Sequence, residues 1–338
     1  MKALNLIRER ARQAPKRIVL CEGDDERVLK AATLAVKRGY AEILMVGDIP
    51  AIQRTAEDAG VDLTSMTLID PRSSPCTQRL VERLVALRAH KGMSESEAAR
   101  AVLDPLVFAN LMVSEGLADG SVAGATHTTA DVVRCALQLI GKAPGVSLVS
   151  SFFLMMLCKP FHEFSGGMIF SDCGLVVEPS DMELADIALA AAGSAEVLLD
   201  EPARVAMLSF STGGSACHAA VDKVVRAARR VKAERPELAI DEDVQLDAAI
   251  VAEVSARKVP ESRVKGRANV LIFPDLEAGN IGYKLAERLG GAEAIGPLLQ
   301  GLARPANDLS RGCSIEDIVN VITVTTVQAQ HQSADNHD

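Results

Sequence analysis

The feature that most constrains this fold is a regular alternation of short apolar runs with helical patterns near the start of the chain. The runs at Arg17–Cys21, Glu42–Val46 and Thr67–Ile69 have the length and composition of buried strands. Between them, Glu26–Lys37 and Ile49–Ala59 carry apolar residues at helical spacing. Strands that are joined by helices, and not by tight turns, predict a parallel sheet with crossover helices.

A strand followed by a turn of small residues and a helix recurs three times further along the chain. The turns are Gly124–Asp131, Ser211–Ser215 and Asp275–Lys284. Such turns let backbone N–H groups approach an anion closely, so each is a candidate phosphate cradle. The second turn fits neither a Walker loop nor G-x-G-x-x-G, so a dinucleotide site is not supported. The residues expected to bind phosphate or substrate in the last two turns are Ser211, Thr212, Gly214, Ser215, Asn280, Gly282 and Lys284.

Two arginines lie at helix ends where an acidic chain could use them to bind a polyanionic ligand. The formal net charge is −9, so such a ligand would depend on local arginines or helix N-termini. Arg134 lies one turn into the helix that follows Thr128 and Thr129, and Arg88 lies late in the helical pattern Thr77–Lys91. Structural alternatives stay open for both. The threonine can be an ordinary N-cap beside an exposed Arg134, and Arg88 can complement the helix dipole.

The stretch Asn307–Asp317 precedes the last apolar helix pattern and gathers three chemically useful side chains. Ser310 supplies a hydroxyl, Arg311 a guanidinium suited to phosphate, and Asp317 a carboxylate. Together they could handle a small phosphorylated substrate. The structural alternative is that Ser314 and Asp317 form a capping box, in which Asp replaces the usual Glu or Gln.

Composition and length exclude several classes of protein. The chain of 338 residues suggests about two domains, and Pro144-Gly145 is a candidate boundary. No basic stripe with interleaved aromatics occurs, so nucleic acid is not an expected partner. The longest apolar run, near Leu148–Cys158, is too short to span a membrane, and the N-terminus lacks a signal-peptide block. The seven cysteines are scattered and the six histidines form no H-E-x-x-H pattern, so we expect a cytoplasmic protein without a bound metal.

Four long segments of the chain resemble the phosphate acetyltransferases, also called phosphotransacetylases. The segments are VAGATHTTADVVR, FSTGGSA, ANVLIFPDLEAGNIGYK and IGPLLQGLARPANDLSRGCSIEDIV. They occur in order within a similarity that covers about Arg17 to Gln328. This makes the match much more specific than any single glycine-rich turn.

The resemblance implies a reaction, a fold and an assembly. The reaction is acetyl-CoA + phosphate ⇌ acetyl phosphate + CoA, in which coenzyme A is a substrate and no cofactor is needed. The implied fold has two α/β/α domains with an inter-domain cleft, is like that of isocitrate and isopropylmalate dehydrogenases, and returns to the first domain at its end. Domain I would comprise residues 1–145 and 299–338, and domain II residues 146–298. The implied assembly is a homodimer.

The resemblance also implies roles for individual residues. Ser310, Arg311 and Asp317 match the active-site residues of the family, while Arg88 and Arg134 match arginines implicated in binding CoA. The CoA-binding residues expected are Arg88, Arg134, Thr128 and Thr129.

We expect the CoA thiolate to attack the carbonyl of acetyl phosphate directly in a ternary complex. Asp317 would take the thiol proton, Arg311 would hold the phosphoryl group, and Ser310 would stabilise the oxyanion. An acyl-enzyme on Cys158, Cys173 or Cys313 is the alternative mechanism, although no histidine is visibly paired with these cysteines.

Alternatives to acetyl transfer stay open. The nearest is a phosphate propionyl- or butyryltransferase with the same chemistry, and another is a non-catalytic CoA-sensing domain. A hydroxyacid dehydrogenase on the related fold would need a metal-binding aspartate cluster and a nucleotide site, and the sequence has neither. Several family members carry a lysine where this chain has Gly213-Gly214. The runs VAMLSFSTGGSACH and LGGAEAIGPLLQGLA are closer to short forms associated with ethanolamine utilisation, so the pathway is open.

Overall fold

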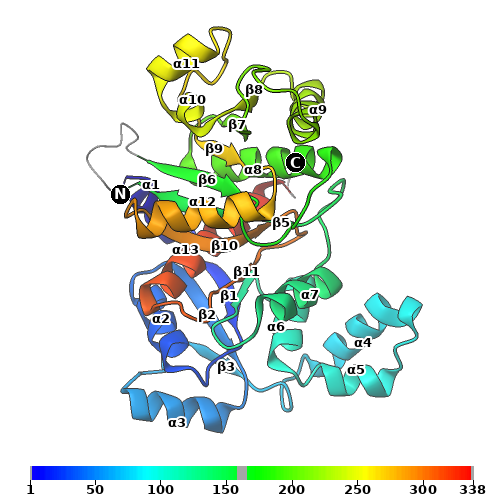
Figure 1. Cartoon of the computed structure of the whole chain (residues 1–338). Coiled ribbons are helices and arrows are strands. Elements are labelled where there is room, and N and C mark those ends of the chain that lie inside the picture. The colour runs from blue at the N-terminus through cyan, green and yellow to red at the C-terminus, as the bar shows by residue number, and fades with distance from the viewer. Residues whose placement is uncertain (1, 158–165, 336–338) are drawn as a thin grey trace. The chain divides into compact units, whose positions relative to one another are not determined.

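The structure, a computed structural model, describes residues 2–157 and 166–335. The chain divides into two compact units, which Figure 1 shows in one view. Unit 1 comprises Met1–Leu6 with Gly145–Gly301, and unit 2 comprises Ile7–Pro144 with Leu302–Asp338. The domain boundaries expected from the sequence place the first six residues in the other unit. The division into domains I and II stays a prediction.

Unit 2 is built on a parallel sheet of five strands in the order β11-β4-β1-β2-β3. The strands are β1 (Lys16–Leu20), β2 (Ala41–Val46), β3 (Thr67–Ile69), β4 (Gly120–Ala123) and β11 (Ala306–Asp308). The helices are α1 (Lys2–Gln13, which starts in unit 1), α2 (Glu26–Lys37), α3 (Ile49–Ala59), α4 (Thr77–Arg88), the 3-10 turn η1 (Ala89–Lys91), α5 (Glu95–Ala101), α6 (Pro105–Ser114), α7 (Thr129–Leu139) and α13 (Ile315–Asp335). The alternating sequence pattern therefore correctly predicts a parallel sheet with crossover helices.

Side-chain caps fix where the helices of unit 2 begin. Asp25, Asp48 and Asp104 accept hydrogen bonds from first-turn N–H groups of α2, α3 and α6. Ser94 and Glu97 form a reciprocal capping box at the start of α5. Each cap satisfies N–H groups that the helix itself leaves without a partner.

Helices cover both faces of the unit 2 sheet. On one face, Val19 of β1 belongs to a buried cluster that includes residues of α4, α6 and α7. On the other, α13 packs against α2, β1 and β4. Gly120 permits this close approach, since a Cβ there would lie 2.7 Å from Cγ2 of Thr325. The buried hydroxyls of Thr323 and Thr325 donate to carbonyls four residues earlier, so α13 can be buried without unpaired hydroxyls at these positions.

Unit 1 is built on a mixed sheet of six strands in the order β10-β5-β6-β9-β7-β8. The pairs β10/β5 and β5/β6 are antiparallel, and the other pairs are parallel. The strands are β5 (Ser150–Met156), β6 (Gly167–Ser171), β7 (Arg204–Leu208), β8 (Ala239–Val244), β9 (Val270–Ile272) and β10 (Glu293–Gln300). The helices are α8 (Asp181–Leu199), α9 (Ala219–Glu234), α10 (Leu246–Ile250), α11 (Ala252–Lys258) and α12 (Leu276–Arg288).

The helices α8 and α12 lie on opposite faces of the unit 1 sheet. Phe153 of β5 stacks on Tyr283 of α12 with ring centroids 4.0 Å apart. The next residue, Leu154, points to the other face because strand side chains alternate. On that face, Leu154 and Leu199 of α8 both lie close to Gly167: a Cβ added to this glycine would be 3.0 Å from each leucine side chain.

The sequence patterns missed or misjudged several elements of unit 1 and one of unit 2. Strand β8 was missed because Asp241–Asp243 are acidic; it is an edge strand, and yet Asp241 and Asp243 are buried in it. Strand β11 has only three residues and was also missed. The sequence pattern at Asp247–Glu253 predicts a single helix, but the chain forms the pair α10 and α11 there. The helical sequence pattern after Ser180 predicts a helix that ends at Ala192, but α8 continues to Leu199. No helix among residues 2–157 and 166–335 is long and apolar enough to cross a membrane.

Candidate functional site

The carboxyl ends of three neighbouring strands bring several candidate residues of unit 2 together. Strands β11, β4 and β1 lie side by side and are parallel, so the loops at residues 309–314, 124–128 and 21–25 leave the same edge of the sheet. Helices α13, α7 and α2 start where these loops end. The positive ends of three helix dipoles therefore lie at one edge of the sheet, which favours an anionic ligand there.

Ser310, Arg311 and Asp317 lie in the loop before α13 and in its first turn. Ser310 and Arg311 are exposed, and no hydrogen bond or ion pair within the described part of the chain engages the Arg311 guanidinium. Oδ2 of Asp317 accepts bonds from the Ser314 N–H and hydroxyl at 2.8 Å each, and the Asp317 N–H donates to Ser314 Oγ at 3.2 Å. The capping box is thus confirmed. Oδ1 of Asp317 has no partner among the described residues, so one carboxylate can both cap the helix and face a substrate.

The first candidate turn is already filled by a carboxylate of the protein. Glu22 is only 2% exposed, and it accepts hydrogen bonds from the backbone N–H groups of residues 124–127 at 2.9 to 3.1 Å. The Thr126 hydroxyl and Nδ1 of His127 also bond to it, at 3.0 and 2.7 Å. The structure therefore does not support this turn as a backbone cradle for a ligand phosphate, because Glu22 occupies its donors.

The buried Glu22 is hydrogen-bonded to the partly buried His127. Burial by itself raises the pKa of Glu22, but the hydrogen bonds from His127 and from the backbone of residues 125–127 outweigh it and hold the pKa at about 2. The hydrogen bond to Glu22 in turn raises the pKa of His127 above its ordinary value. This pair fixes the loop between β4 and α7 to the end of β1.

The two threonines of the first turn have different partners. Thr128 is the N-cap of α7: its Oγ1 accepts from the Asp131 N–H at 3.2 Å and donates to the Asp131 carboxylate at 2.7 Å. Arg134 is exposed and pairs with the same carboxylate at 2.9 Å. Thr129 instead donates to Asp308 at 2.7 Å. The N-cap interpretation is confirmed for Thr128, whereas roles of Thr128, Thr129 and Arg134 in binding CoA stay predictions.

Asp308 is a wholly buried carboxyl two residues before Ser310. Burial raises its pKa to about 6, despite the hydrogen bonds from Thr129 and the Leu309 N–H, and the charge of Glu22 acts in the same direction as burial. Its Oδ1 is buried without a hydrogen-bond partner in the structure. Gly124 leaves the space for this carboxyl, since a Cβ there would collide with Asp308 Oδ1.

The second candidate turn, in unit 1, is also bonded internally. Ser211 is buried, and its hydroxyl donates at 2.8 Å to Oδ2 of Asp243, which also accepts from the Gly214 N–H at 3.0 Å. The Thr212 N–H donates to Ser215 Oγ at 3.0 Å. In this structure the donors of Ser211, Thr212, Gly214 and Ser215 are bound internally, and contacts of these residues with phosphate or substrate stay a prediction.

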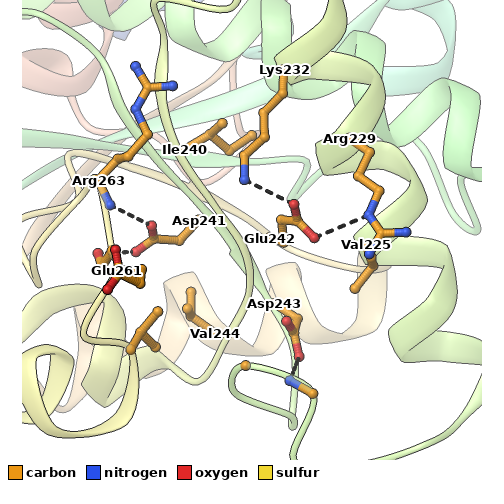
Figure 2. A pocket seen from close by; sticks show the side chains of 14 residues that line it. Val225, Arg229, Lys232, Ile240, Asp241, Glu242, Asp243, Val244, Glu261 and Arg263 are labelled. Carbon is orange, nitrogen blue, oxygen red and sulfur yellow. Dashed lines mark hydrogen bonds and ion pairs between the residues drawn. The ribbon is translucent and has the colours of Figure 1, made fainter.

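A polar pocket adjoins this turn. Its volume is about 460 Å³, and Gly213 and Gly214 form part of its wall. Figure 2 shows Arg229 and Lys232 of α9 reaching toward Glu242 of β8, with N–O distances of 3.4 and 3.0 Å. The pocket is lined by four carboxylates and three cations, so it gives no specific reason to assign a phosphate ligand.

The third candidate turn is largely helical. Asp275 is the N-cap of α12 and accepts from the Ala278 N–H at 2.8 Å. Asn280, Gly282 and Lys284 therefore lie within a helix and not in a phosphate-binding turn. The predicted turn is wrong here because the Asp275 cap starts the helix earlier than the glycines suggest.

Packing explains part of the glycine pattern in α12. A Cβ at Gly282 would lie 2.8 Å from the ring of Phe273, so this glycine allows α12 to lie close to the end of β9. Asn280 donates to the carbonyl of Cys173 at 3.3 Å. The ammonium of Lys284 lies 5.8 Å from the ring centroid of the preceding tyrosine. Contacts of Asn280 and Lys284 with substrate stay predictions.

The remaining candidates are Arg88 and the cysteines. Arg88 is the last residue of α4, half-buried, where a cation complements the helix dipole, and its role with CoA stays a prediction. Cys173 and Cys313 are buried, and burial raises the pKa of both thiols. This environment does not favour a thiolate nucleophile. Cys158 lies outside the described residues.

Three charged residues at this edge of unit 2 were not predicted from the sequence: Glu22, Arg27 and Asp308. The acidic turn after the first strand is a visible signal, because carboxyl ends of parallel strands share an edge of the sheet. What the sequence could not supply is the strand order, which places β1 beside β4 and β4 beside β11.

Comparisons with known proteins agree with this arrangement. Residues 2–326 match the family model described as phosphate acetyl/butaryl transferase. A phosphate acetyltransferase of Clostridium acetobutylicum is 48% identical over 330 residues, which cover 98% of this chain and 99% of the relative. The EutD phosphotransacetylase from Staphylococcus aureus superposes with a TM-score of 0.90 at 42% identity, covering 97% of this chain and 98% of that one. A phosphotransacetylase from Streptococcus pyogenes gives a TM-score of 0.91 at 40% identity, with 98% of each chain covered.

The chain therefore belongs to the phosphate acetyl/butaryl transferase family, whose model it matches along almost its whole length. The resemblance seen in the sequence motifs and the two α/β units are both confirmed by these matches.

Proposed function

We infer that this chain is a phosphate acetyltransferase, which transfers acetyl reversibly between acetyl-CoA and inorganic phosphate. The observation that carries this conclusion is the full-length match to curated phosphate acetyltransferases, together with the family model over residues 2–326. Ser310, Arg311 and Asp317, the residues expected to act on substrate, all lie at or beside one edge of the unit 2 sheet.

We propose that acetyl phosphate binds beside Arg311 at this edge. The exposed guanidinium can donate two parallel hydrogen bonds to phosphoryl oxygens. The three helix N-termini favour the same negative charge. The backbone turns do not compete for it, because internal carboxylates already occupy their donors.

The proposed reaction is a direct displacement within a ternary complex. Asp317 Oδ1 accepts the proton of the CoA thiol as the sulfur attacks the acetyl carbonyl and the S–C bond forms. The Ser310 hydroxyl donates to the tetrahedral oxyanion. The C–O bond to phosphate then breaks, and Arg311 stabilises the departing phosphate. The buried, protonated thiols of Cys173 and Cys313 support this route over an acyl-enzyme.

We propose acetyl as the preferred acyl group, with propionyl or butyryl transfer as the alternative that substrate competition decides. A non-catalytic CoA-sensing role is the remaining alternative, and the free Arg311 and the paired but accessible Asp317 argue against it. We propose that no cofactor takes part and that CoA, acetyl phosphate and phosphate are the substrates. A cytoplasmic location is supported by the unpaired state of the six cysteines among the described residues.

We also propose that the enzyme is a homodimer, with unit 1 as the side that binds the second copy. Among the described residues, eight of the ten exposed large apolar side chains lie in unit 1: Val177, Met182, Phe210, Leu246, Val251, Ile281, Leu285 and Leu289. Surface of this kind is typical of protein interfaces when it is contiguous. Light scattering coupled to size-exclusion chromatography tests the assembly, and a monomeric mass at micromolar concentration would contradict it.

The function is tested by CoA-dependent thioester formation from acetyl phosphate, followed by thioester absorbance, with propionyl and butyryl phosphate in parallel. We expect acetyl phosphate to be preferred and Arg311→Gln and Asp317→Asn each to lose on the order of 100-fold or more in turnover. Arg54→Gln and Asp58→Asn, both exposed on α3, are matched controls that should keep wild-type activity. Full activity in both site variants would refute the site, and CoA binding without any turnover would favour the sensing role.

A further inference from the structure

The guanidinium of Arg27, near the start of α2, has an acceptor for each of its five N–H groups. Nε and one N–H of Nη2 bond to the Asp25 carboxylate, at 3.1 and 2.7 Å. The other N–H of Nη2 donates to the Ala125 carbonyl at 3.1 Å. Nη1 donates to the carbonyls of Arg311 and Cys313, at 2.9 and 3.0 Å. A fully used fork of this kind is a built feature and not a solvated surface arginine.

These acceptors belong to the three loops at the edge where β1, β4 and β11 end. Asp25 follows β1, Ala125 follows β4, and Arg311 and Cys313 follow β11. No backbone hydrogen bond within the described residues joins the loop at 311–313 directly to the loop at 21–25. Arg27 therefore supplies a connection between these loops that the sheet itself does not.

We propose that Arg27 is a positioning residue for the acetyl-transfer reaction, which sets the peptide groups that hold Ser310 and Asp317. This inference rests on the proposed function of those two residues. Because a peptide group is planar and trans, fixing a carbonyl also fixes the N–H of the next residue, on the opposite side.

The two fixed peptides lead directly to the proposed reacting groups. The carbonyl of Arg311 shares its peptide with the Gly312 N–H, which donates to Ser310 Oγ at 3.3 Å. The carbonyl of Cys313 shares its peptide with the Ser314 N–H, which donates to Asp317 Oδ2 at 2.8 Å. Arg27 thus acts on the hydroxyl and on the carboxylate through one peptide group each.

Lysine cannot replace this arrangement. Its ammonium has three donors around a single atom and cannot reach acceptors in three separate loops with the geometry of a planar fork. The Arg27 side chain is also only 30% exposed and that of Asp25 15%, so water cannot readily take over all of the lost contacts.

The test is a kinetic comparison of Arg27→Lys with Arg17→Lys. Arg17 is a matched control, because it pairs with Asp119 at 2.8 Å and donates to the Gly116 carbonyl at 3.1 Å, but it lies at the opposite end of β1. We expect Arg27→Lys to lower kcat by roughly 10- to 100-fold, since a misplacement of about 1 Å can cost a factor of about 100. The KM for CoA should change by less than about threefold, and Arg17→Lys should keep kcat within about twofold.

A double-mutant cycle separates positioning from general damage to the fold. In an Asp317→Asn background, Arg27→Lys should lower kcat by a factor at least about threefold smaller than in the wild-type background, because its route through Asp317 is already lost and only the route through Ser310 remains. A fully multiplicative loss, or an unchanged kcat in the wild-type background, would overturn the proposal. If Asp317→Asn keeps wild-type turnover, the proposed mechanism fails, and the positioning role of Arg27 fails with it. If Asp317→Asn is inactive but Arg27→Lys keeps wild-type kcat, only the positioning role of Arg27 is refuted.

If Arg27→Lys does not fold, Asp25→Asn provides a second test of the same proposal. It keeps the arginine and its carbonyl contacts but removes the charge that anchors one side of the fork. We expect kcat to fall by roughly 3- to 10-fold, a smaller loss than a misplacement of about 1 Å causes. An unchanged kcat in this variant would overturn the proposal.

Discussion

Replacing Glu22 by glutamine tests whether an internal carboxylate stabilises the turn that the sequence offered to a ligand. The carboxylate accepts four backbone N–H groups, one hydroxyl and the His127 ring. Glutamine has a similar shape but only one acceptor oxygen, and its amide N–H groups would meet donors. We therefore expect Glu22→Gln to destabilise unit 2 and to loosen the loop between β4 and α7.

The magnitude follows from the pKa of the buried carboxyl. The turn lowers the pKa of Glu22 from 4.5 to about 2, and each pKa unit corresponds to about 1.36 kcal/mol, so the charge contributes about 3 kcal/mol at pH 7. The folded-state pKa is depressed, so this contribution is complete above pH 4.5 and is lost as pH falls toward 2. At pH 3 it is about 1 to 2 kcal/mol. His127 acts in the opposite sense, since its raised pKa stabilises the folded state below pH 6.5 and this gain is lost as pH rises.

Melting followed by calorimetry or circular dichroism is the suitable assay, because the chain contains no tryptophan. For a unit of this size, about 3 kcal/mol corresponds to roughly 6 to 12 °C in Tm at pH 7. Glu57→Gln, on the exposed side of α3, is the matched control and should leave Tm unchanged. A Glu22→Gln variant with wild-type Tm, or a Tm difference that does not shrink between pH 5 and pH 3, would refute the reasoning.

Three further predictions concern other buried groups. Burial raises the pKa of Asp308 from 3.8 to about 6, so ionising this carboxyl disfavours the folded state. Asp308→Asn should therefore gain stability relative to wild type as pH rises from 4 to 8, by up to about 3 kcal/mol. A Tm difference between the two proteins that is flat over this range would contradict this. Cys313→Ser should keep kcat within about threefold and show no acyl-enzyme burst, whereas a loss beyond about 100-fold would reopen the covalent route. Gly279→Ala should destabilise unit 1 by about 1 to 3 kcal/mol in calorimetry, because the added Cβ would collide with the Asp172 carbonyl and lie 3.1 Å from Cys173 Sγ. An unchanged Tm would contradict this and show that α12 can shift to make room.

Local patterns in the sequence predicted local structure well. The helices Glu26–Lys37 and Ile49–Ala59 are found with the expected bounds, because their apolar spacing and flanking residues are unambiguous. The capping box at Ser314 is also present. These features depend on residues within one turn of each other, which is the range over which sequence spacing alone is informative.

Features that depend on strand order could not be predicted in the same way. The turn at residues 124–127 has the composition of an anion site, and it does bind an anion, but that anion is Glu22 from another strand end. The unpaired Oδ1 of Asp308 likewise arises only because β11 lies beside β4. Neither contact leaves a signal in the spacing of nearby residues.

The internal carboxylates change how this protein must bind phosphate. Glu22 fills one glycine-rich turn, Asp243 fills a second, and Asp172 accepts from the N–H groups of residues 174–176 in a third loop. In each case the backbone stabilises a buried charge of the protein and leaves few donors for a ligand. A chain with net charge −9 must then recruit phosphate through side chains, and at the edge of unit 2 Arg311 has a guanidinium without a bound partner among the described residues. Phosphate affinity should therefore depend far more on Arg311 than on any glycine-rich turn.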